Sequence, residues 1–105
     1  MIDMENSSID ECQEFVKNFV KERNWETAPN EIVIHMTEEM GEIARAVLKY
    51  SEYGGNHQKI DENFGEELAD MFYLLLKLSN TLNLKLSGEF IKKMESNKKR
   101  FPAKA

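Results

Sequence analysis

Two pairs of acidic residues at helical spacing are the features of this chain best suited to chemistry. Glu39 and Glu42 form the first pair, and Glu67 and Asp70 form the second. A spacing of three residues places both members of a pair on the same side of a helix, about one turn apart. Each pair stands in an amphipathic run where apolar side chains would be expected. Carboxylates crowded there repel one another unless a cation balances their charge.

The donor set of the two pairs contains oxygen alone. His35 and His57 have no partner at ligand spacing, so we interpret them as a surface or interface side chain and a loop residue. Oxygen ligands that leave room for water and phosphate suit Mg²⁺, with Mn²⁺ as a substitute. The sequence therefore predicts a magnesium site, which in turn indicates a phosphate-bearing substrate. Its predicted metal ligands are Glu39, Glu42, Glu67 and Asp70.

Four amphipathic segments must position these acids, and they define an all-α chain. Ser8 and Glu11 have the spacing of a capping box, Pro29 suits a first helical turn, and Ser87 is expected to start the last helix. The run 71–76 lacks β-branched residues and follows strong helix formers, so we interpret it as buried helix rather than strand. The predicted helices cover about 8–23, 29–51, 63–83 and 87–100, followed by a short basic tail at 101–105.

The angular positions of the acids place them at the edge of the core. With 100° per residue, Glu39 falls about 60° from Met36 on the second helix, beside its apolar stripe. Glu67 and Asp70 border the apolar side of the third helix in the same way, whereas Glu38 and Glu66 point away from the stripes. If the second and third helices pack antiparallel, three or four carboxylates converge where they cross. We expect Glu38 to be an accessory residue and Glu66 a helix cap.

Length and charge set limits on the class of protein. At 105 residues, the chain is expected to form one domain over 1–105. Residues 1–84 carry a charge of −10 and residues 85–105 carry +5, which argues against a nucleic-acid ligand for the main body. The single cysteine, Cys12, and the lack of an apolar run long enough for a membrane span or a signal peptide favour a cytoplasmic protein.

The order of the motifs resembles a known family, the MazG-like nucleoside triphosphate pyrophosphohydrolases of the all-α NTP pyrophosphatase group. That family shows Glu-x-x-Glu, a gap, and then Glu-x-x-Asp, as do residues 37–44 and 65–70 here. The basic segment 93–102 and the segment 22–25 are similar to the dCTP pyrophosphatase-like branch. The chain departs from that branch at Leu74, where an aromatic residue is expected, and at Thr27 and Ala28, which replace a histidine.

The resemblance implies a four-helix bundle-like protomer that forms a dimer or a dimer of dimers. It also implies hydrolysis of a (deoxy)nucleoside triphosphate to the monophosphate and pyrophosphate by attack of water at the α-phosphorus. Glu38 or Glu39 would orient the water or accept its proton. Trp25 is the candidate for stacking on the base, and the candidates for phosphate binding on the last helix are Lys93, Asn97, Lys98 and Arg100.

Other interpretations stand beside this one. Trp25 also suits a core or interface position, and the basic residues of the last helix also suit an ordinary helix end that interacts with the helix dipole. A di-iron carboxylate bundle needs Glu-x-x-His, which neither motif provides. A non-catalytic helical interaction module would keep the fold without turnover. In either case, the apolar residues that surround the third helix predict a second subunit.

Overall fold

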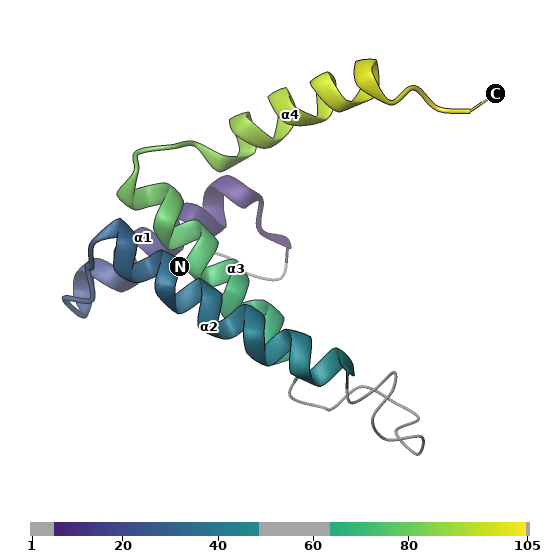
Figure 1. Ribbon diagram of the computed structural model, residues 1–105. Helices are drawn as coiled ribbons and strands as arrows, with labels where there is room; N and C mark the ends of the chain where they lie inside the picture. The colour runs from purple at the N-terminus through teal and green to yellow at the C-terminus, as the bar shows by residue number, and fades with distance from the viewer. Residues whose placement is uncertain (1–5, 49–63, 105) are drawn as a thin grey trace.

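The computed structural model describes residues 6–48 and 64–104, and these residues form four helices (Figure 1). They are α1 (Ile9–Glu22), α2 (Pro29–Leu48), α3 (Phe64–Thr81) and α4 (Leu86–Arg100). The described ranges contain no strand, which confirms the all-α prediction and the helical interpretation of the run 71–76. The predicted C-terminal end of the second helix, at about residue 51, and the predicted start of the third, at about residue 63, lie outside the described residues.

Local sequence signals explain how α1 and α3 begin and end. The Ser8 hydroxyl accepts a hydrogen bond from the Glu11 amide at 3.1 Å, and the Glu11 carboxylate accepts one from the Ser8 amide at 2.9 Å, so the predicted capping box is confirmed. Asn24 and Asn83 follow the ends of α1 and α3 with φ angles of 54° and 56°. This left-handed conformation, with the amide two residues beyond the cap bonded back into the last turn, closes both helices.

The predicted start of the last helix at Ser87 is wrong by one residue, because α4 begins at Leu86 with Lys85 as its N-cap. Lys85 makes no side-chain cap hydrogen bond. The Ser87 hydroxyl instead donates to Oδ1 of Asp10 on α1 at 2.5 Å. The serine thus joins two helices rather than capping one, a role that spacing along the chain does not reveal.

The core lies along α3, between α1 and α2. Val16 and Val20 of α1 pack on Leu76 of α3, and all three are buried. On α2, Ile32 and Ile43 are buried, and Leu74 of α3 is 1% exposed. α2 and α3 lie side by side and run in opposite directions (Figure 1), the arrangement needed to bring the two acidic motifs to the same level.

α4 departs from this three-helix layer. It contacts mainly α1, has no buried residue, and projects away from the α2–α3 pair in Figure 1. Its apolar residues Phe90 and Ile91 are 53% and 60% exposed. Packing of all four helices into one bundle within a single chain is therefore not confirmed. None of the helices that the structure describes is both long and apolar enough to cross a membrane.

Candidate carboxylate site

The antiparallel packing of α2 and α3 brings the two acidic motifs close enough to influence each other. Burial of Glu39 raises the pKa of its carboxyl above the ordinary value of 4.5, and the charges of Glu42, Asp70 and Glu67 raise it further. Two of these three charges come from α3, which lies more than twenty residues further along the chain. The carboxylates thus form one electrostatic cluster across the helix interface.

The four acids divide into an inner and an outer pair. Glu39 is the inner residue of α2, with a side chain only 15% exposed. Glu67 is the inner residue of α3, and its Oε2 atom is buried without a hydrogen-bond partner among the described residues. Glu42 and Asp70 are exposed, one turn further along their helices. A buried carboxylate oxygen without a donor is costly, so Glu67 marks the position where a cation would be most favourable.

The carboxylates are grouped, but they are not arranged as a metal-ligand shell. In the parts of the chain that the structure describes, no three His, Cys, Asp or Glu side chains are placed to hold one metal ion. The donor chemistry still fits a hard divalent cation, since the cluster offers only carboxylate oxygens and one of them is buried without a partner.

His35 is an exposed side chain, as predicted, and it also lies beside the carboxylate cluster. Its Nε2 atom lies 3.5 Å from Oε1 of Glu39, one turn along α2, and its charge when protonated lowers the pKa of Glu39. The spacing of four residues between His35 and Glu39 was the available signal. His57 lies outside the described residues. Glu38 is exposed, and Glu66 is exposed in the first turn of α3.

An aromatic cluster connects Trp25 to the carboxylates. The indole of Trp25 meets the ring of Phe19 edge-on at 5.6 Å, and Phe19 meets Tyr73 edge-on at 6.1 Å. Burial raises the pKa of the Tyr73 hydroxyl, and among the nearby charges Arg23 lowers it while Asp70 raises it. Arg23 also lies over the Phe19 ring at 3.8 Å. Trp25 is 51% exposed and therefore available to a ligand, and its ring is linked to Tyr73 through Phe19.

The predicted phosphate-binding residues of α4 are not brought to the carboxylates within one chain. They lie on the helix that projects away from α2 and α3 (Figure 1). Three of them are exposed and Asn97 is half-buried. Arg100 lies over the ring of Phe101 at 5.2 Å. The residues concerned are Lys93, Asn97, Lys98 and Arg100.

Two comparisons with known proteins found no match for this chain. No protein-family model matches the chain, and no curated protein matches it significantly.

Proposed function

We propose that the protein hydrolyses (deoxy)nucleoside triphosphates to the monophosphate and pyrophosphate in the presence of Mg²⁺ or Mn²⁺. The observation that carries this proposal is the inner pair of carboxylates, one from each helix. Glu39 has a pKa raised by burial and by its neighbours, and Glu67 has a buried oxygen without a partner. Such a pair is unfavourable in a protein that binds nothing there, and it suits a site for a cation and its phosphate ligand.

Each residue has a distinct role in the proposed reaction. Glu39, Glu42, Glu67 and Asp70 would hold the metal, which when bound neutralises phosphate charge and lowers the pKa of a bound water. Glu39 is the preferred group to accept the proton of the attacking water, because a raised pKa makes a carboxylate a better base. Glu38, exposed on the same helix, is the second candidate. Trp25 offers an exposed aromatic face for the base.

Basic residues for the phosphates would come from a second copy of the chain. α4 projects from its own protomer with Phe90, Ile91 and Met94 exposed, and it carries the basic residues of segment 93–102. Leu68, Phe72 and Leu75 of α3 are also exposed, on a flank away from Asp70. Apolar surface on both elements supports a homodimer, or a dimer of dimers, in which α4 reaches the partner. We expect Phe72→Asp to shift sedimentation toward the monomer, and Ile34→Asp on the outer side of α2 to leave it unchanged.

The exposed apolar surfaces equally favour the second candidate, a non-catalytic helical interaction module. The two functions differ in turnover. We expect pyrophosphate release when the protein is incubated with a panel of nucleoside and deoxynucleoside triphosphates and Mg²⁺, with a preference for one base. Absence of both pyrophosphate and orthophosphate with every nucleotide, at a protein concentration where the homodimer is intact, would support the interaction module instead.

A further inference from the structure

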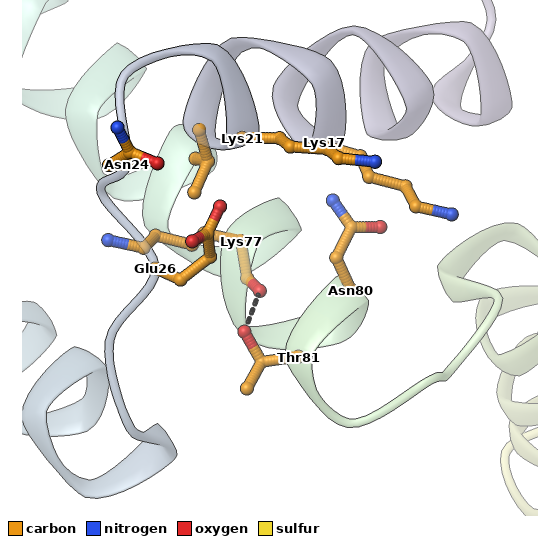
Figure 2. Close-up of a pocket in the computed structure, with 8 residues that line it drawn as sticks. Lys17, Lys21, Asn24, Glu26, Lys77, Asn80 and Thr81 are labelled. Carbon is orange, nitrogen blue, oxygen red and sulfur yellow. Dashed lines mark hydrogen bonds between the residues drawn. The ribbon is translucent and has the colours of Figure 1, made fainter.

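A cavity of about 470 Å³ lies between α1 and α3, away from the carboxylate cluster. Figure 2 shows Lys17 and Lys21 along the α1 wall, with Lys77, Asn80 and Thr81 on the α3 wall. The remaining lining residues are Val20, Asn24 and Glu26. The volume is within the range of small-molecule sites, about 300 to 1,000 Å³.

Positive charge is concentrated in this cavity. Residues 1–84 contain seven Lys and Arg residues in all, and three of them line it: Lys17, Lys21 and Lys77. No carboxylate of the described residues lies within ion-pair distance of these three ammonium groups. Among the described residues of the lining, Glu26 is the single acid, so their charges sum to a surplus of two positive charges on a chain of net charge −5.

This arrangement has a cost that an anion would remove. Lys17 and Lys21 are four residues apart on one face of α1, where like charges repel each other. Lys77 comes from α3 and is half-buried, and its ammonium group lies at the Asn24 and Glu26 end of the cavity, away from those of Lys17 and Lys21 (Figure 2). The amides of Asn24 and Asn80 are polar groups of the same lining, whereas the Thr81 hydroxyl donates to the Lys77 carbonyl at 2.9 Å. Buried Val20 supplies an apolar wall.

We propose that the α1–α3 cavity binds a small phosphate-bearing anion, up to the size of a nucleoside monophosphate. Several separate ammonium groups neutralise a multiply charged phosphate as point charges, and the side-chain amides supply neutral hydrogen bonds. This site is distinct from the carboxylate cluster and does not depend on the proposed hydrolysis. The two also respond oppositely to metal, because the carboxylates repel phosphate when no cation is present.

Titration calorimetry and amide chemical shifts in EDTA, at low ionic strength, test the proposal with pyrophosphate, AMP and succinate as probes. We expect pyrophosphate and AMP to bind with Kd below about 1 mM and to shift the amides around Lys21 and Lys77. Succinate, which matches AMP in charge but lacks phosphate, should bind at least about tenfold more weakly. Equal binding of succinate and AMP would overturn the phosphate assignment, and shifts spread over all lysines would overturn the site.

Substitutions that remove a positive charge and one that removes a negative charge should change the affinity for pyrophosphate in opposite directions. Lys77→Gln and Lys21→Gln should each weaken pyrophosphate binding about tenfold, whereas Glu26→Gln should strengthen it about threefold because it removes the only negative charge in the lining. Lys92→Gln, an exposed lysine of α4 outside segment 93–102, is the matched control and should leave affinity unchanged. Circular dichroism verifies that each variant is folded. Equal affinities of the Lys77, Glu26 and Lys92 variants would refute the proposal.

Discussion

The two halves of α3 face opposite charges, although they belong to one continuous helix. Glu67 and Asp70 of the first half act electrostatically on Glu39 of α2. Lys77, Asn80 and Thr81 of the second half line the cavity that two lysines of α1 also line. Asp70 and Lys77 are seven residues apart, so they lie on the same side of α3, about 10 Å apart along its axis. The same side of one helix thus borders a negative cluster and a positive cavity.

The local charge differs because each half of α3 packs against a different helix. Glu39 and Glu42 of α2 lie near the first half, and Lys17 and Lys21 of α1 lie near the second. In each case like charges outnumber the opposite charge, which His35 supplies beside the carboxylates and Glu26 supplies in the cavity lining, and this surplus favours a ligand of the opposite sign. A cation and a phosphate-bearing anion are therefore the two ligands that this comparison predicts.

The largest expected effect tests the negative half. Glu67→Gln keeps the shape of the side chain but removes the charge that would hold the metal, so kcat/KM for pyrophosphate release should fall at least about 100-fold. Glu66→Gln, one residue earlier and exposed, is the matched control and should stay within about twofold of the unmodified protein. Equal rates for the two variants would remove Glu67 from the site.

A smaller effect is expected on stability. Mg²⁺ at ten times its Kd should raise the free energy of unfolding by about 1.4 kcal/mol, or the melting temperature by roughly 6 °C, because it binds only the folded chain. Glu39→Gln should reduce this gain, whereas Lys77→Gln should preserve it. The measurement is a thermal melt with and without Mg²⁺. Identical melting curves for the unmodified protein in both buffers would contradict a cation site between α2 and α3.

The raised pKa of Glu39 predicts a dependence of stability on pH in metal-free buffer. An acid whose pKa is higher in the folded state favours folding fully below its ordinary value of 4.5, and this contribution is lost as pH rises through the folded-state pKa. Glu39→Gln cannot ionise, so its melting temperature relative to the unmodified protein should increase from pH 4 to pH 7. A difference that stays constant over this range would show that neither burial nor the neighbouring carboxylates raise the pKa of Glu39.

Much of the fold was accessible from the sequence, because periodicity and capping residues act locally. The capping box at Ser8 and Glu11 is confirmed, and all four helices are present in the described ranges. The departure of α4 was not predicted, because an apolar stripe indicates that a face is buried but not which surface buries it. Ser87 was misassigned for a similar reason, since its partner Asp10 is 77 residues away.

Prediction of the candidate sites has the same limit: local motifs are visible in the sequence, whereas contacts between distant residues are not. The acids were found because each pair is a local motif, whereas ligation by Glu39 and Glu67 and the roles of Trp25 and Arg100 stay predictions. The lysine cavity was missed because Lys77 lies 56 residues after Lys21, and each lysine alone resembles a solvated helix face. Only the packing of α1 on α3 brings these charges together.

The smallest expected effect concerns the residue that ends the positive half of α3. Asn83 has a φ angle of 56°, and the Leu84 amide donates to the Ser79 carbonyl at 2.8 Å to close the helix. Because Asn tolerates this conformation better than Ala, Asn83→Ala should lower the free energy of unfolding by about 0.5 to 1 kcal/mol, while Asn83→Gly should be neutral or slightly stabilising.

The same substitution at Asn18, exposed within α1, should have the opposite sign, because Ala is the better residue in a helix interior. Urea unfolding of the three variants measures these differences. Since Leu84 leads into α4 and Asn80 lines the lysine cavity, loosening this helix end should also weaken pyrophosphate binding while leaving the Mg²⁺ effect at the other half unchanged. Equal loss of both ligands would mean that α3 responds as one rigid unit and that its two halves are not independent sites.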